Sequence, residues 1–335
     1  MKRKVKLSEQ RLNRWGYFFV LPFVLVYFIF HFYPTIYTFL LAFTDLKGLQ
    51  TSFSFIGLQN FNKLVHDPYF WGALRNTFII WGYNFVPQLG IALILAVWFT
   101  DLRLNLKGRN LFRAVVYMPN LLTAASVALL FRSLFGYPVG PVNQFLQGVL
   151  GLYQKVERDG KIIEEAFNFF RNVTVTRSIV AFIQWWMWYG HTLIMLMAGI
   201  TSISPTLFES ALVDGANNRQ TTWNITLPLL RPMMLYILIT SMIGGMQMLD
   251  IPFLLTDMRG APDNKIRTTT VYLFNVGFQG RNDYAYTAAI SIGVFIITVI
   301  LALLIFFFIQ DRSELKQTSL EKRALKLAKK GGING

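Results

Sequence analysis

The sequence predicts an all-α integral membrane protein with six transmembrane helices. Of its 335 residues, 54% are hydrophobic, 16% are aromatic and only 15% are charged, whereas soluble domains carry about 25% charged residues. Six stretches contain no Asp, Glu, Lys or Arg, and each has the roughly 17 or more residues that a membrane-spanning helix needs. These predicted spans are residues 15–44, 76–100, 114–131, 178–208, 232–249 and 284–310.

The first span follows a basic segment, as the apolar region of a secretory signal does. Its apolar part is longer than the roughly 7–15 residues of a signal peptide, and no small-x-small cleavage site stands out. The sequence therefore predicts an uncleaved anchor. The preceding basic residues are Lys2, Arg3, Lys4, Lys6, Arg11 and Arg14.

Charge is distributed unevenly between the two sides of the predicted spans. Segments 1–14, 101–113, 209–231 and 311–335 hold 19 basic and 7 acidic residues, whereas the rest of the chain holds 13 basic and 10 acidic residues. Because basic residues accumulate on the cytoplasmic side, this pattern places both termini in the cytoplasm. An even number of spans also requires both termini to lie on the same side of the membrane. The bias of basic residues toward the cytoplasmic side accounts for the net charge of +15, so this charge does not indicate a nucleic-acid partner.

The predicted organisation is a cytoplasmic tail of residues 1–14, a membrane domain of residues 15–310 and a basic cytoplasmic tail of residues 311–335. The stretch 315–330 is rich in Lys and Arg. It is expected either to lie on the anionic inner leaflet or to form a solvated basic helix.

Motifs of catalysis are missing from the sequence. There is no cysteine and no G-x-x-x-x-G-K-[ST], H-E-x-x-H or G-x-S-x-G motif, and the histidines are His31, His66 and His191. The chain is therefore expected to have no catalytic residues, no bound metal and no cofactor of its own.

An unusually long segment, residues 140–177, lies on the predicted outer side. It contains a polar run, residues 154–161, and then a short pattern typical of a helix through Ile162, Ile163, Ala166, Phe167 and Phe170. We expect a small extracytoplasmic cap here.

The inward loop of residues 204–228 has the clearest local signals. Ser204 and Pro205 are typical of a helix start, and Gly215 is typical of a helix end. A second helix is expected over residues 218–226, which gives a helix–turn–helix elbow in the cytoplasm. One apolar stripe is predicted on the first helix, and an exposed stripe usually marks a binding partner. The stripe consists of Leu207, Phe208, Ala211 and Leu212.

The same loop carries a resemblance to a known family. Glu209-Ser210-Ala211, Gly215, Ile225 and Leu227-Pro228 follow the spacing of the EAA loop of ABC importer permeases, with Ser210 in place of the usual alanine. Further segments resemble the sugar-importer branch that includes the maltose and glycerol-phosphate permeases. They are residues 72–77, 214–216, 225–232, 247–250 and 253–256. The chain departs from this branch at residues 257–262, which read Asp-Met-Arg-Gly-Ala-Pro instead of a glycine-rich sequence, and in its long segment 147–177.

This resemblance implies the type I ABC importer permease fold in a bacterial cytoplasmic membrane. It implies four kinds of partner: a second, homologous permease subunit, a cytoplasmic ATPase dimer that binds ATP and Mg, an extracytoplasmic solute-binding protein and a sugar. The elbow would couple the permease to the ATPase, and Gly215 would permit a backbone turn that a β-carbon disfavours. The implied coupling residues are Leu207, Phe208, Glu209, Ala211, Leu212, Asp214 and Gly215.

Polar and aromatic residues in the fourth and fifth spans are candidates for sugar binding. Gln184, Trp188 and His191 share one helical face, and polar groups in a span usually face a cavity. Gln247 and Asp250 lie toward the outer end of the fifth span. Alignment with the maltose permease adds Met187 to Gln184, Trp188 and His191. For each candidate an interfacial aromatic belt or a structural hydrogen bond is the alternative.

Two other functions remain possible at this point. A secondary transporter or channel for a small polar solute needs no ATPase, but usually shows intramembrane acids or a repeated half. An intramembrane enzyme lacks a catalytic constellation here. The sugar is expected to be a di- or oligosaccharide, and a polyol or a uronic-acid oligosaccharide stays open.

Overall fold

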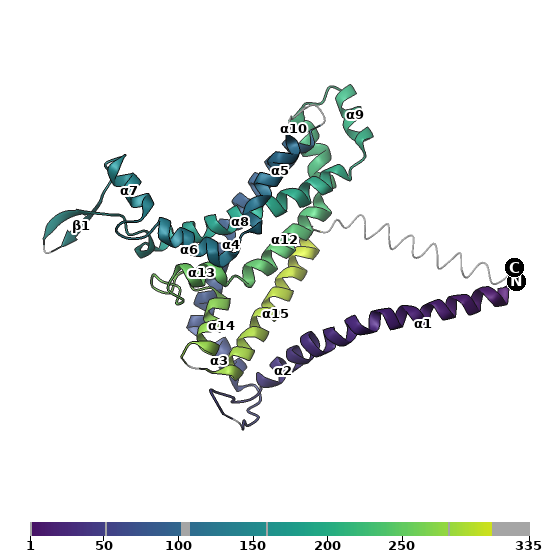
Figure 1. Cartoon of the computed structure of the whole chain (residues 1–335), viewed down its shortest axis with the longest axis horizontal. Coiled ribbons are helices and arrows are strands. Elements are labelled where there is room, and N and C mark those ends of the chain that lie inside the picture. The colour runs from purple at the N-terminus through teal and green to yellow at the C-terminus, as the bar shows by residue number, and fades with distance from the viewer. Residues whose placement is uncertain (1, 51, 102–107, 159, 281, 310–335) are drawn as a thin grey trace. The chain divides into compact units, whose positions relative to one another are not determined.

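The computed structural model describes residues 2–50, 52–101, 108–158, 160–280 and 282–309. These residues form helices joined by loops, together with a two-stranded hairpin (Figure 1). The predicted basic tail 311–335 lies outside the described residues. The fold class is therefore all-α, as the sequence predicts.

Five of the six predicted spans are long apolar helices. Their ranges are Trp15–Leu41, Pro68–Thr100, Val173–Thr201, Arg231–Leu255 and Tyr284–Ile309. The first consists of α1 (Lys2–Tyr27), a π-helical turn (Phe28–Phe32) and α2 (Tyr33–Leu41). The others are α4 (Pro68–Thr100), α8 (Val173–Thr201), α12 (Arg231–Met246) with α13 (Asp250–Leu255), and α15 (Tyr284–Ile309).

The predicted third span is not one continuous helix. Its residues form α5 (Arg109–Tyr117), a 3₁₀ turn (Met118–Leu121) and α6 (Ala124–Leu134), and the two helical parts are bent by 88°. Pro119 stands in the turn, and Leu122 and Thr123 are extended. The side chain of Thr123 accepts a hydrogen bond from the backbone N–H of Ser126, so it caps a new helix instead of continuing the old one.

The long segment after α6 contains strands where the sequence suggested a helix. It begins with α7 (Pro141–Gly148), followed by β1 (Gln154–Arg158) and β2 (Lys161–Glu165), which pair antiparallel with Val156 opposite Ile163. The expectation of a short helix through Ile162 and Ile163 is wrong, because two β-branched residues follow a turn at Gly160, whose φ is +72°.

The base of this segment is fixed by Asn143, which is fully buried. Its side-chain amide donates to the carbonyls of Gly136 and Phe167, and its carbonyl oxygen accepts from the N–H of Phe167 at 2.9 Å. These hydrogen bonds join α7 to the chain just after β2 and so fix the base of the hairpin.

The chain forms two compact units. The described residues of one lie within 2–71 and 272–296, and those of the other lie within 72–271 and 297–309. Among the described residues, two apolar cores lie in the second unit. The first is built around Ile80, Val127, Val180, Ile183, Ile251 and Ile266, and the second around Ala92, Ala96, Leu193, Leu196, Leu230 and Ile237.

The first unit is held together by Asp67, which lies just before α4. Its carboxylate accepts hydrogen bonds from the hydroxyls of Tyr272 in α14 (Thr269–Phe278) and Tyr286 in α15. Burial raises the pKa of the Asp67 carboxyl, but the hydrogen bonds that it accepts outweigh this effect. The pKa consequently lies below the usual value of an aspartate, and the charged form stabilises the folded unit.

Close to Asp67, the ammonium of Lys63 lies 3.3 Å from Oδ2 of Asp283 and 3.6 Å from the centre of the Tyr286 ring. The polar cluster thus ties α3 (Gln59–Val65) to the start of α15.

Replacement of Asp67 by Asn is expected to lower the melting temperature of the purified protein. Asn has one acceptor oxygen, so it cannot accept hydrogen bonds both from the two tyrosine hydroxyls and from the backbone N–H of Tyr69. Each lost bond costs about 1 kcal/mol. The difference from the parent should shrink below about pH 4, because the stability that a lowered aspartate pKa provides is lost as the pH falls through it. Thermal unfolding in detergent across this pH range measures the effect. Asp263→Asn, a change at an exposed carboxylate, serves as control, and equal melting curves for D67N and D263N would contradict the role.

Candidate functional site

The elbow predicted at residues 204–228 is confirmed as a local structure. It begins with α9 (Pro205–Val213), continues through α10 (Asn218–Thr221), a π-helical turn (Thr222–Thr226) and α11 (Leu227–Leu229), and leads into α12. Ser204 and Pro205 stand at the N-cap and first helical positions, although the hydroxyl of Ser204 contacts that of Thr206 instead of a helix N–H.

Gly215 ends α9 in a Schellman motif. Its φ is +76°, the N–H of Ala216 donates to the carbonyl of Ala211, and the N–H of Gly215 donates to the carbonyl of Leu212. Asn217 then opens the next helix with a capping box, in which its side chain and that of Gln220 bind each other's backbone N–H groups. The turn is therefore defined by hydrogen bonds at both of its helix ends.

The predicted apolar stripe of α9 is divided between two faces. Ala211 is buried and Phe208 packs against the second apolar core. Leu207 is 44% exposed, and Val213, which the sequence analysis did not single out, is 87% exposed. Leu212, also a member of the predicted stripe, is 54% exposed. Leu207, Leu212 and Val213 therefore form the apolar surface that is open to a partner.

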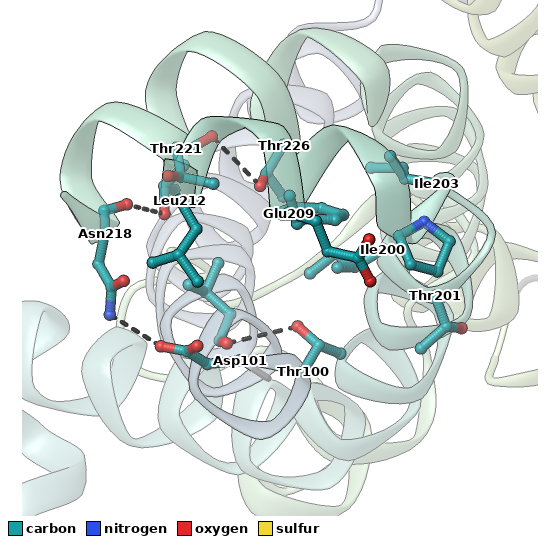
Figure 2. Close-up of a pocket in the computed structure, with 14 residues that line it drawn as sticks. Thr100, Asp101, Ile200, Thr201, Ile203, Glu209, Leu212, Asn218, Thr221 and Thr226 are labelled. Atoms are coloured by element: carbon teal, nitrogen blue, oxygen red, sulfur yellow. Dashed lines mark hydrogen bonds between the residues drawn. The ribbon is translucent and has the colours of Figure 1, made fainter. Parts of the chain in front are cut away.

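A cavity of about 250 Å³ separates α9 from the ends of α4 and α8; we name it the elbow cavity. Figure 2 shows the carboxylate of Glu209 pointing into it, and Asp101 on its wall. Asp101 accepts a hydrogen bond from the amide of Asn218 at 2.8 Å, which joins the end of α4 to α10. The rest of the lining consists of Asn218, five threonines and six apolar residues, which are Val97, Ile200, Ile203, Pro205, Phe208 and Leu212.

A second cavity, of about 210 Å³, lies among α4, α8 and α12; we name it the span cavity. Gln184, Trp188 and His191 all line it, and the rings of Trp188 and His191 meet edge to face. They lie near the middle of α8. The remaining wall residues are Asn84, Gln88, Thr192, Met195, Tyr236, Ile237, Thr240, Ser241, Gly244, Gly245 and Met248.

The structure places the other three candidate residues elsewhere. Met187 is buried in the first apolar core of the second unit. Gln247 is the exposed C-cap of α12, and Asp250 is the exposed first residue of α13. None of the three is among the residues that line the span cavity.

Two wall residues from α4 were missed by the sequence analysis. Gln88 donates to the hydroxyl of Thr192 at 2.8 Å. Asn84 is only 7% exposed, and its side-chain oxygen has no hydrogen-bond partner among the residues that the structure describes. Both residues are uncharged, so the stretch 76–100 is free of charge with them in it, and charge alone does not reveal them. Their spacing of four residues within an apolar span is the signal that would have identified them.

The wall of the span cavity offers amides, hydroxyls and aromatic rings, and its only ionisable side chains are His191 and Tyr236. Such a wall can bind an uncharged polar molecule through hydrogen bonds and ring contacts. Within the described part of the chain, no three His, Asp or Glu residues lie close enough together to bind a metal ion.

The amino-acid sequence is similar to those of known transport permeases. The chain is 28% identical over 309 residues to a lactose transport system permease protein of Rhizobium radiobacter, which covers 91% of this chain and 98% of the relative. It is 29% identical over 288 residues to an arabinooligosaccharides transport system permease protein of Bacillus subtilis, which covers 86% of each chain.

Among solved structures, the chain resembles a bacterial ABC transporter involved in the import of the acidic polysaccharide alginate. The TM-score is 0.72 at 25% identity, over 91% of this chain and 98% of that one. The model of the family "binding-protein-dependent transport system inner membrane component" matches residues 88–316. The chain therefore belongs to this family of multi-pass inner-membrane permeases.

Proposed function

We propose that this chain is the permease subunit of an ATP-driven importer that moves a sugar, either a di- or an oligosaccharide, across the cytoplasmic membrane. The observation that carries the proposal is the span cavity, where uncharged hydrogen-bonding groups and aromatic rings from three membrane helices converge. Membership of the family supplies the transport class, and the named cargoes of the relatives are sugars.

The chemistry of the wall favours a neutral sugar. The C–H faces of a sugar ring can stack on Trp188 and Tyr236, and its hydroxyls can bind the amides of Gln184 and Asn84. The unpaired oxygen of Asn84 gains most from such a bond, because a buried polar atom without a partner costs free energy. The lining contains no Lys or Arg to pair with a uronic acid, so an acidic oligosaccharide is the weaker choice.

The size of the cavity suggests that the sugar is shared between subunits. About 210 Å³ is below the roughly 300–1,000 Å³ of common ligand pockets. Trp188 and Tyr236 are about half exposed at its edge. A second, homologous permease would cover these rings and supply the rest of the binding surface.

The elbow is proposed to bind a cytoplasmic ATPase dimer, which holds ATP and Mg and performs the hydrolysis. Leu207 and Val213 give this contact its apolar part, and the motif at Gly215 fixes the direction of the chain after α9. Both termini lie in the cytoplasm in this proposal, and a solute-binding protein delivers the sugar on the other side, as the family description implies.

The proposal predicts that transport requires nucleotide hydrolysis. Proteoliposomes that contain this chain with its partner permease and ATPase should take up a radiolabelled panel of lactose and arabinooligosaccharides when the binding protein and ATP are supplied. A nonhydrolysable analogue should not support uptake. Accumulation driven by a proton or sodium gradient without ATP would instead indicate a secondary transporter.

Replacement of Trp188 by Ala is expected to raise the KM for sugar uptake about tenfold, since loss of an aromatic contact costs roughly 1–2 kcal/mol. Trp98→Ala is the matched control, because Trp98 is also an exposed tryptophan of a membrane helix but does not line the span cavity. Radiolabelled uptake at several sugar concentrations, normalised to membrane expression, measures both. Unchanged kinetics in W188A would exclude the aromatic contact.

Replacement of Gly215 by Val is expected to uncouple transport from hydrolysis, because a β-branched residue resists a φ of +76°. Gly215→Asn should retain more uptake, since Asn tolerates this conformation. An added Cβ meets no atom within 4 Å, so steric clash does not confuse the comparison. Sugar-stimulated ATPase activity and uptake are measured together, and full coupling in G215V would contradict the role of the turn.

A further inference from the structure

The fifth span is interrupted beside the span cavity. Helix α12 ends at Met246 and α13 begins at Asp250. Leu249, between them, has φ −118° and ψ −62°, and it leaves the regular helical geometry. Gly244, Gly245 and Met248 belong to the cavity wall, so the wall is shaped by this break.

Proline explains why the break exposes a carbonyl. In a continuous helix the carbonyl of Met248 would accept from the N–H of residue 252, but residue 252 is Pro and has no N–H. An unpaired carbonyl at membrane depth is costly because no water is present to bind it. The helix itself therefore cannot satisfy Met248.

Three consecutive threonines supply donors at this point. The hydroxyl of Thr268 donates to the carbonyl of Met248 at 2.7 Å. The hydroxyls of Thr269 and Thr270 donate to the carbonyl of Met246 at 3.3 and 3.0 Å. Thr268 and Thr269 are completely buried, so these bonds are not exchanged with solvent. We name Thr268, Thr269 and Thr270 the threonine clamp.

The clamp is itself fixed from α4 and α8. The hydroxyl of Thr77 accepts from the N–H of Thr269 at 2.9 Å. The amide of Asn76 donates to the carbonyls of Asn264 and Arg267, and its oxygen accepts from the guanidinium of Arg177 at 2.8 Å. The clamp and the loop that precedes it are thus connected to both helices that form the other cavity walls.

We propose that the threonine clamp positions the broken span and so sets the shape of the sugar-binding wall. Thr268 replaces the helix donor that Pro252 removes, and Thr269 and Thr270 bind the carbonyl of Met246 at the end of α12. Thr268 and Thr270 are positioning residues: neither is among the residues that line the cavity. The effect on sugar uptake rests on the proposed function, whereas the effect on the geometry of the break does not.

A cysteine reporter tests the geometry directly, since the chain has no cysteine of its own. Gly244→Cys places the thiol on the cavity wall, where an added Cβ meets no atom within 4 Å. Its rate of labelling by a small, water-soluble methanethiosulfonate is measured in the assembled transporter. Thr268→Val and Thr270→Val should each change this rate roughly three- to tenfold, the effect of losing one hydrogen bond inside a membrane protein.

Three further variants separate positioning from general damage. Thr268→Ser retains the hydroxyl and should label as the parent does. Thr38→Val removes a hydroxyl that bonds the carbonyl of Pro34 inside an unbroken part of a helix, and should have no effect. Pro252→Ala restores an N–H opposite the carbonyl of Met248, so the T268V/P252A double variant should recover the parent rate.

The outcomes are distinguishable. Parent-like labelling in T268V and T270V, or failure of P252A to rescue T268V, would overturn the proposal. In the chain without the reporter, T268V should raise the KM for a transported sugar while T268S leaves it unchanged. Absence of sugar uptake by the parent would count against the proposed function alone, since the labelling rates still decide whether the clamp positions the wall.

Discussion

Polar groups inside the hydrocarbon layer must find partners within the protein, and this constraint organises the second unit. At the break in the fifth span, threonine hydroxyls bind the carbonyls of Met246 and Met248. On α4, Gln88 is paired with Thr192, and the side-chain oxygen of Asn84, at the cavity wall, has no partner in the described part of the chain. Polar side chains and interrupted backbone lie together at the span cavity, because lipid offers neither of them a hydrogen-bond partner.

The helices that enclose this cavity also reach the elbow. The ends of α4 and α8 line the elbow cavity, and their middle parts line the span cavity. Between the two cavities the helices pack through Ala92, Ala96 and Leu196, which are fully buried. Close-packed side chains transmit displacement instead of absorbing it. A displacement of α9 can therefore reach the wall of the span cavity through packed side chains, which suits the elbow to the ATPase contact proposed above.

Much of this arrangement could be predicted from the sequence. Absence of charge identifies five spans, because length and apolarity alone define a membrane helix, and Pro205 with Gly215 identifies the limits of α9. The break of the third span was missed because a single Pro119 inside an apolar stretch does not reveal an 88° bend. The faces of α9 and the burial of Met187 depend on tertiary packing, which periodicity does not contain. At residues 257 and 258, Asp and Met take positive φ, a conformation that favours glycine, so local composition was a poor guide to the backbone there.

The account depends most on the elbow facing the cytoplasm, where a separate ATPase can reach Leu207 and Val213. Val213→Cys provides a single exposed thiol in a chain without cysteine. Its modification by a membrane-impermeant maleimide can be compared in right-side-out and inside-out vesicles. The account predicts labelling in inside-out vesicles only, with protection when the ATPase is bound. Labelling in sealed right-side-out vesicles would place the elbow outside the cell and contradict the account.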